Sequence, residues 1–215
     1  MAKAKPRIPL SPELIYQTAL EQINQAGLEK FSMRSLATRL GVDPMAVYHH
    51  IPSKAALMEG IYDMIFGELL AEDQPMPDHW QDKLLELAHR FRALALRHHK
   101  LFPSLIASKH IGHNELKALD TLLGTLLEAG LDPSATVQVG DSVFALVTGF
   151  ALLEISELQN TIPHTGAERL TDEAETDFIT TRTLLEPLTD NTFRNSFETG
   201  LQLIIDGIKV KLQKN

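Results

Sequence analysis

The sequence contains no cysteine, which excludes a disulfide scaffold, thiolate zinc sites and cysteine nucleophiles. It shows no apolar run near the roughly 18 residues that a membrane-spanning helix needs, and its basic N-terminus lacks the apolar stretch of a secretory signal. It also lacks the G-x-S-x-G, H-E-x-x-H, G-x-G-x-x-G and P-loop patterns. These absences predict a cytoplasmic protein that is not an enzyme and needs no cofactor.

Alternating strand patterns of useful length are absent as well, and apolar residues recur at helical spacing instead. The sequence therefore predicts an all-α fold, in which an N-terminal three-helix bundle precedes a larger C-terminal helical domain. The helices are expected at about residues 12–26, 33–40, 44–51, 54–70, 80–100, 102–110, 115–129, 133–158, 172–185 and 191–213. Ser11, Ser32, Asp43 and Ser53 are the expected N-caps of the first four.

The charge is divided unevenly along the chain. The net charge is −8, but residues 1–54 carry seven cations and four anions, whereas residues 55–215 are strongly acidic. Either this imbalance is chance clustering, or the basic part binds a polyanion. We expect two domains, residues 1–54 and residues 55–215.

Residues 33–52 have the spacing of a helix-turn-helix. Ala37 is small where a second helix can cross, Gly41 falls at the turn, and Val47 is the apolar residue of the second helix. Any helical hairpin with a glycine turn fits the same pattern, so the exposed residues have to decide between them.

The second helix of this pair has no large acid in its N-terminal half, as a helix that approaches phosphates requires. Tyr48, His49 and His50 offer hydroxyl and imidazole donors, and Lys54 falls at the predicted start of the next helix. Two adjacent helical histidines point about 100° apart and cannot readily share one metal ion. Because imidazole gains a proton in mild acid, DNA binding is predicted to tighten there.

The stretch FSMRSLATRLGVDPMAVYHHIPSKAAL resembles the N-terminal DNA-binding signature of the TetR family of transcriptional repressors. WQD at 80–82 and FETGLQLIIDGI at 197–208 are similar to the ligand-binding domain of its tetracycline-repressor-type members. The resemblance implies a homodimer that binds a palindromic operator and is released by a small molecule. Activation would use the same surface, and an all-α ligand carrier or enzyme without DNA binding is the alternative.

The resemblance implies that Arg34 reaches a base, that the second helix reads the major groove, and that flanking residues contact phosphates. Direct readout would rest on Arg34, since methionine and alanine lack fork-like donors. Lys3, Lys5 and Arg7 form either an arm along the DNA backbone or a tail without a role. The DNA-binding residues are therefore expected to be Ser32, Met33, Arg34, Pro44, Met45, Ala46, Tyr48, His49, His50 and Lys54.

Small residues recur in the helices at 133–158 and 191–213, among them Gly140, Gly149, Gly200 and Gly207. In the family the corresponding helices form the dimer interface; packing within one chain is the alternative reason for small residues.

Effector contacts are expected from Phe91, Phe102, His110, His113 and Phe144. His110 and His113 are three residues apart, so they would share a helical face. The alternatives to an effector contact are that both are solvated surface histidines or that they bind a metal ion. Leu70 and Leu87 stand where tetracycline repressors carry polar drug contacts, so a more apolar effector than tetracycline is expected.

Overall fold

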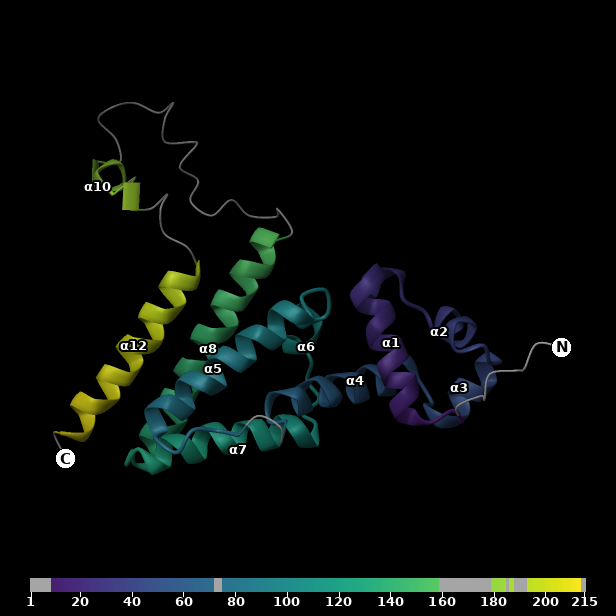
Figure 1. Cartoon of the computed structure of the whole chain (residues 1–215), viewed down its shortest axis with the longest axis horizontal. Helices are drawn as coiled ribbons and strands as arrows, with labels where there is room; N and C mark the ends of the chain where they lie inside the picture. The colour runs from purple at the N-terminus through teal and green to yellow at the C-terminus, as the bar shows by residue number, and fades with distance from the viewer. Residues whose placement is uncertain (1–8, 72–74, 159–178, 185, 188–192, 214–215) are drawn as a thin grey trace. The chain divides into compact units, whose positions relative to one another are not determined.

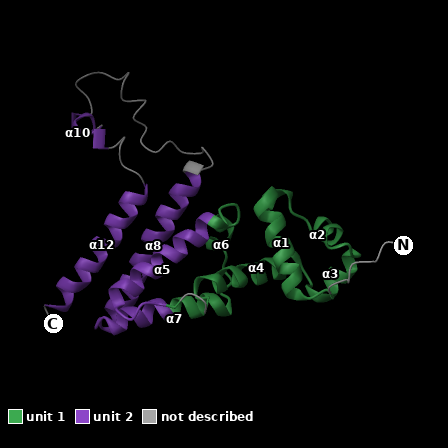
Figure 2. Cartoon of the chain, viewed as in Figure 1, with its two compact units in different colours: residues 1–75, 97–120 green, residues 76–96, 121–215 purple. Residues whose placement is uncertain are grey.

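The computed structural model describes residues 9–71, 75–158, 179–184, 186–187 and 193–213. Every regular element within these ranges is a helix, which confirms the predicted fold class (Figure 1). The chain divides into two compact units (Figure 2). Unit 1 consists of residues 1–75 and 97–120, and unit 2 consists of residues 76–96 and 121–215. The predicted arm at Lys3, Lys5 and Arg7 lies outside the described residues.

Unit 1 is built on its first helix, which packs against the second and the fourth, while the second packs against the third. Ile15, Ile23, Leu36 and Leu57 are fully buried and form the centre of this core. The compact unit thus extends past residue 54, where the sequence suggested a domain boundary. Its helices are α1 (Pro12–Ala26), the short 3-10 helix η1 (Leu28–Lys30), α2 (Met33–Leu40), α3 (Pro44–His50), α4 (Lys54–Leu69), α6 (Phe102–Ile106) and the first part of α7 (His113–Glu128).

The helices of the N-terminal bundle begin where capping residues predict. The Ser11 side chain accepts the backbone N–H of Leu14 at the start of α1, over 3.3 Å. The Ser53 side chain accepts the N–H of Ala56 at the start of α4, over 3.0 Å. Such bonds satisfy backbone donors that have no partner inside the helix.

Unit 2 contains α5 (Trp80–Arg97) up to Leu96, the rest of α7, α8 (Pro133–Leu158), α10 (Ile179–Thr183) and α12 (Phe193–Leu212). The long helices α8 and α12 pack against each other. Phe197 and Leu201 of α12 are fully buried, and Val147 and Ile155 of α8 are nearly so. These apolar residues form the buried sides of the two helices.

Two helix predictions need correction. The helix expected at 102–110 ends at Ile106, so the chain from 108 to 112 is a connection. Of the helix expected at 172–185, only α10 falls among the described residues; residues 172–178 lie outside them.

The expectation that no segment is long and apolar enough to span a membrane was also wrong. Pro133–Ser156, within α8, meets that test by length and composition. The described contacts give another reason for its apolar character. One side of α8 packs on α12, and Glu154 near its end forms an ion pair with Arg92 of α5.

Candidate nucleic-acid interface and effector residues

The chain reverses between α2 and α3 at Gly41, which adopts the left-handed conformation with φ 69° and ψ 32°. Glycine has no Cβ to clash there. The N–H of Val42 then donates to the carbonyl of Ala37 over 3.1 Å, which closes the C-terminal end of α2. Ala37 and Val47 are fully buried where the two helices pack. The helix-turn-helix read from the spacing is confirmed.

This turn leaves one face of α3 in solvent. The Asp43 side chain caps the helix by accepting the N–H of Met45 over 2.8 Å, and Pro44 occupies the first turn. Met45 is 72% exposed and Tyr48 is 40% exposed, although both carry large apolar groups. Pro44 and Ala46 are half-buried beside them. Exposed apolar side chains on a short, well-capped helix indicate a surface that meets a partner.

His49 and His50 end α3 and are both exposed. Their ring centroids lie 6.1 Å apart and the ring planes are at 86° to each other. Among the residues that the structure describes, no group of three His, Asp or Glu side chains could hold a metal ion. The geometry of the His49 and His50 rings fits two separate contacts along a polyanion better than one shared ligand.

The start of α2 forms a second part of the same surface. Ser32 and Ser35 form a reciprocal capping box there. The Lys54 ammonium donates to the carbonyl of Phe31 over 3.5 Å and lies 5.6 Å from the centre of the Phe31 ring. A cation therefore stands beside a helix N-terminus, where backbone N–H groups already favour an anion.

Met33 does not fit its predicted role through its side chain, which is only 7% exposed. It is the first residue of α2 and points into the core of unit 1 because this helix is amphipathic. A phosphate contact at this position would have to come from the backbone N–H group.

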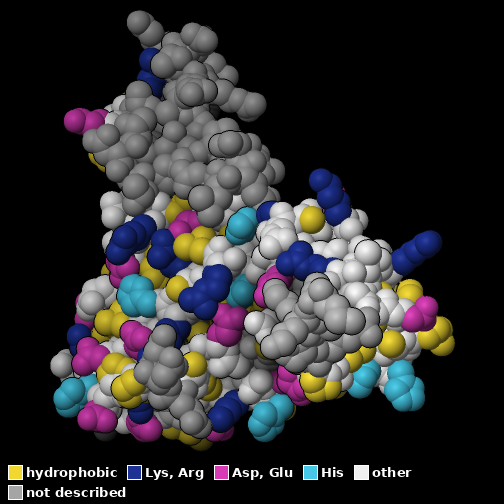
Figure 3. All heavy atoms as spheres, turned by 45° about the vertical axis from the view of Figure 1, so that its right-hand side comes forward, with side chains coloured by type: hydrophobic (Ala, Val, Ile, Leu, Met, Phe, Trp, Pro, Cys, Tyr) yellow, Lys and Arg dark blue, Asp and Glu magenta, His cyan; other side chains and the backbone are white. Residues whose placement is uncertain are grey.

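The two arginines of α2 differ in their partners. Arg39 is held by α1, since its guanidinium donates to Gln25 Oε1 over 2.8 Å and to Glu21 Oε2 over 3.3 Å. Arg34 is exposed, and its guanidinium bonds to no other described side chain. Arg34 is therefore the arginine of this helix that can reach a ligand. Lys, Arg and His side chains also project from the surface at the right of Figure 3.

The residues expected to bind an effector fall in both units. Phe91 of α5 and Phe144 of α8 belong to unit 2 and make an edge contact, with ring centroids 5.8 Å apart. Phe144 is 46% exposed, so this pair has an accessible aromatic face. Phe102 belongs to unit 1 and is completely buried, so it serves the core there, and a ligand could touch it only if that core opened.

His110 and His113 do not share a helical face, because α7 begins only at His113. The start of α7 is fixed by Asp63 of α4, which accepts the N–H of Asn114 over 2.7 Å. Gly112 is needed at this point, since a Cβ there would collide with the Asp63 carboxylate. His110 lies in the connection before the helix, exposed, with Nδ1 3.9 Å from Glu59.

Two polar features of unit 2 were missed by the sequence analysis. Arg92 donates twice to Glu154, over 2.7 Å and 2.5 Å, and its guanidinium lies over the Phe197 ring. The Thr148 hydroxyl of α8 is buried and has no hydrogen-bond partner among the described residues. The sequence signal for the first pair was a charged residue on an otherwise apolar helix face; no local signal marks Thr148.

Two protein-family models match the chain. The model of bacterial regulatory proteins of the tetR family matches residues 15–61, and the model of the tetracyclin repressor-like C-terminal domain matches residues 74–212. The first match covers the helix-turn-helix together with its flanking helices. The second covers most of the remaining chain.

Curated relatives and solved structures agree with the family models. The chain is 29% identical to the class C tetracycline repressor protein of Escherichia coli, over 96% of this chain and 94% of that repressor. It is 28% identical to the class A repressor from transposon 1721, over 93% and 90%. The crystal structure of the Streptomyces coelicolor TetR family protein ActR in complex with actinorhodin superposes with a TM-score of 0.80, at 26% identity over 95% of this chain and 99% of ActR.

Proposed function

Because the chain belongs to the TetR family of transcriptional regulators, we propose that it represses transcription from a palindromic operator, bound as a homodimer, until a small, fairly apolar effector releases it. Regulators of this family bind operator DNA and small molecules, act as dimers and are not enzymes. The observation that carries the proposal is the turn at Gly41, which presents the exposed face of α3 as a reading surface. An activator would use the same surface, and a promoter fusion distinguishes the two.

In the proposed complex, base readout comes from Arg34 and from the start of α3. A guanidinium forms two hydrogen bonds with guanine, whereas methionine and alanine offer apolar contact to the methyl group of thymine. Arg34 is suited to this role because no described side chain engages it. Pro44, Met45 and Ala46 supply the apolar contacts.

Phosphate contacts come from the donors around the reading helix. Lys54 and the capped start of α2 form one such site, through Ser32 and the backbone N–H of Met33. Tyr48, His49 and His50 on α3 form the other. These contacts set the position of the protein on DNA without reading its sequence.

A comparison of two substitutions tests the DNA surface. The probe is a duplex that the wild-type protein selects from a random pool. Arg34→Ala should cost about 1–3 kcal/mol on that duplex and little on unrelated DNA, because it removes a base contact. Lys54→Ala should weaken binding to both duplexes and lower the slope of log K against log salt by about one.

Lys109→Ala is the matched control, because Lys109 is exposed in the connection between α6 and α7. It removes one positive charge outside the proposed surface and should leave both affinities unchanged. A wild-type protein that selects no DNA at low salt would refute the proposed function. Equal losses of Arg34→Ala on every sequence would move Arg34 to the phosphate contacts.

The effector is proposed to bind beside Phe91 and Phe144. This aromatic pair, with the unpartnered hydroxyl of Thr148 on the same helix as Phe144, suits an apolar compound with one hydrogen-bonding group. The actinorhodin complex of ActR supports a small-molecule effector for this fold. Of the effector residues expected in unit 1, His110 and His113 remain proposed contacts by themselves, whereas Phe102 serves the core there. Thermal shift with a panel of lipophilic aromatic compounds tests this, since a ligand of the folded state raises the melting temperature.

The dimer is proposed to form through α8 and α12. Gly149 and Gly207 face open space in the single chain, and they lie among exposed apolar side chains. Gly140 and Gly200 do not support an interface, because a Cβ at these positions would meet Leu123 and Leu146 of the same chain. Two of the four small positions therefore serve packing within one chain. The exposed large apolar residues on the two helices are Val137, Phe144, Leu153, Leu203 and Val210.

In this proposal residues 1–54 bind DNA, and residues 55–215 bind the effector and form the dimer. A protein that acts on operator DNA works in the cytoplasm of a bacterial cell. Fractionation of cells that express the full chain tests this location.

A further inference from the structure

Arg97, His98, His99 and Lys100 follow one another where α5 ends. In the sequence, cations at a helix C-terminus suggest stabilisation of that same helix. In the structure, Arg97, His98 and Lys100 contact other helices of unit 1 instead. This four-residue segment, residues 97–100, belongs neither to the proposed DNA-binding surface nor to the proposed effector contacts.

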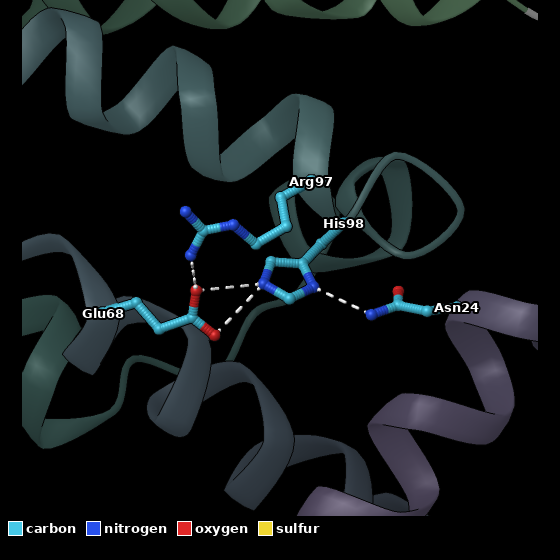
Figure 4. Close-up of polar contacts among 4 residues, drawn as sticks. All are labelled: Asn24, Glu68, Arg97 and His98. Carbon is cyan, nitrogen blue, oxygen red and sulfur yellow. Dashed lines mark hydrogen bonds and ion pairs between the residues drawn. The ribbon is translucent and has the colours of Figure 1, made fainter.

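The His98 ring is 3% exposed and joins two helices (Figure 4). Its Nε2 lies 3.1 Å and 3.2 Å from the two carboxylate oxygens of Glu68 on α4. Its Nδ1 lies 3.1 Å from the amide nitrogen of Asn24 on α1. An amide nitrogen only donates, so Nδ1 accepts and the ring proton sits on Nε2, where it is donated to Glu68.

Glu68 is kept ionised for this role. Burial acts to raise the pKa of its carboxyl group, but the hydrogen bonds from His98 and Arg97, together with the positive charge of Arg97, outweigh burial and hold that pKa below its ordinary value. Arg97 Nη1 donates to Glu68 Oε2 over 2.7 Å (Figure 4). The carboxylate therefore attaches both Arg97 and His98 to α4.

Lys100 completes the contact with α1. Its ammonium donates to the backbone carbonyl of Gln25 over 2.7 Å. That carbonyl belongs to the last turn of α1, where carbonyl groups lack partners within the helix, and α1 has no basic residue of its own in that turn. Lys100 thus supplies, from a distant part of the chain, the cation that favours a helix C-terminus.

We propose that residues 97–100 hold the C-terminal end of α1 and so fix the orientation of the DNA-reading helices, with His98 as the central positioning residue. The other end of the α1–α4 contact is set by packing, since the Tyr16 ring lies directly on Gly60 and a Cβ there would collide with it. One attachment is a close apolar contact, and the other is a directional polar contact that can be broken and remade. Because α1 carries α2, which carries α3, a shift of residues 97–100 moves the reading surface.

The proposal rests on the proposed function only in using DNA binding as its readout. Arg97 is the last residue of α5, the helix that carries Phe91. A rearrangement of α5 on effector binding would therefore reach α1 through residues 97–100 without first moving α3.

Two substitutions of His98 separate its two hydrogen bonds. In His98→Asn, the new amide oxygen takes the place of Nδ1 and still accepts from Asn24, while the bond to Glu68 is lost. In His98→Gln, the new amide nitrogen takes the place of Nε2 and still donates to Glu68, while the bond to α1 is lost. A purely structural role predicts that both variants lose DNA affinity in proportion to their loss of thermal stability.

The experiment measures binding of the full-length dimer to the selected palindromic duplex and to its half-site. His98→Gln should bind the palindrome about five- to tenfold more weakly than His98→Asn, the size expected for one net hydrogen bond, with a smaller loss on the half-site. The palindrome is the more sensitive probe because both reading surfaces must fit it at one fixed spacing. Melting temperatures measured alongside show whether stability follows affinity.

A double-mutant cycle with Asn24→Ala keeps the test independent of folding losses. Asn24→Ala should weaken the wild type by the same factor as His98→Gln, and it should add no further loss in the His98→Gln background. Equal affinities of His98→Gln and His98→Asn, or fully additive losses with Asn24→Ala, would overturn the positioning role. If the wild type itself selects no DNA, the proposed function fails, and that result is distinct from either of these.

Discussion

At the scale of single residues, Glu115 in the first turn of α7 has a carboxyl group whose pKa is raised. Burial is the main cause, and the nearby charge of Asp63 adds to it; the N–H of Gly112 and the charge of His110 oppose it without cancelling it. The protonated form is therefore favoured by folding. Stability from this group is present below the ordinary value of 4.5 and is lost as the pH rises through the raised value.

Glu115→Gln should consequently stabilise the protein at neutral pH, because the amide keeps an acceptor for Gly112 without a buried charge. The gain should disappear near pH 4, where the wild-type carboxyl group is protonated in both states. Melting temperatures of both proteins between pH 4 and pH 8 measure this. Glu59→Gln is the control, because it removes the same charge from a carboxylate whose side chain is 45% exposed. A gain that is constant over the whole range would show that removed charge is not its cause.

Residues whose partners are local were predictable, and residues whose partners are distant were not. The exposure of Met45 and Tyr48 followed from the position of the turn, four and seven residues before them. The bond from Lys100 to Gln25 joins residues that are 75 positions apart, and only the tertiary fold creates it. Phe102 and Met33 were expected to contact the effector and DNA, but their side chains serve the core. Their burial depends on the elements that pack over them.

At the scale of helices, α3 is the shortest element of the reading surface, and it depends on its cap. With seven residues it is too short to be stable by propensity alone, so Asp43 and the packing of Val47 hold it. Asp43→Ala should lower the free energy of unfolding by about 0.5–2 kcal/mol, and operator affinity should fall with it because the start of α3 frays.

Asp43→Asn is the matched variant, since asparagine also caps well, and it should restore most of both quantities. Chemical denaturation measures the free energy of unfolding, and fluorescence anisotropy with the selected duplex measures affinity. Retained affinity in Asp43→Ala at unchanged stability would show that the bond to Met45 does not organise the reading helix.

Helix starts were the elements that sequence reasoning placed best. Ser11, Ser32, Asp43 and Ser53 each precede an apolar helical pattern, and each proved to be an N-cap. The end of α6 was misplaced because the boundary at Ile106 is not signalled by a local breaker. The hydrogen bonds between Asp63 and Asn114 then start α7 as a separate helix.

At the scale of the whole molecule, the fold class followed from the absence of strand patterns and from the helical spacing along the chain. The division into two compact units did not, because α5 and α7 both continue from one unit into the other and no sequence break marks that change. The buried side of α8 could not be predicted either, because apolar residues occur on more than one side of this helix in the sequence. Only the fold shows which stripe α12 covers and which stays exposed for a second copy.

Glycine substitutions on α12 distinguish packing within the chain from packing between copies. Leucine at Gly207 meets no atom within 4 Å of its Cβ in the single chain, and it improves helix propensity. The monomer should therefore stay folded in Gly207→Leu while the dimer weakens. Leucine at Gly200 places its Cβ 2.7 Å from Leu146, so Gly200→Leu should destabilise the chain itself.

Sedimentation equilibrium and melting at several protein concentrations separate the two outcomes. Gly207→Leu should sediment as a monomer at concentrations where the wild type is a dimer, and its melting temperature should no longer rise with concentration. Its affinity for the palindromic duplex should fall towards that for the half-site, since two linked reading surfaces bind more tightly than one. Gly200→Leu should instead melt earlier at every concentration. A Gly207→Leu protein that remains dimeric would place the interface on a different face, because a leucine there cannot fit between two closely packed copies of α12.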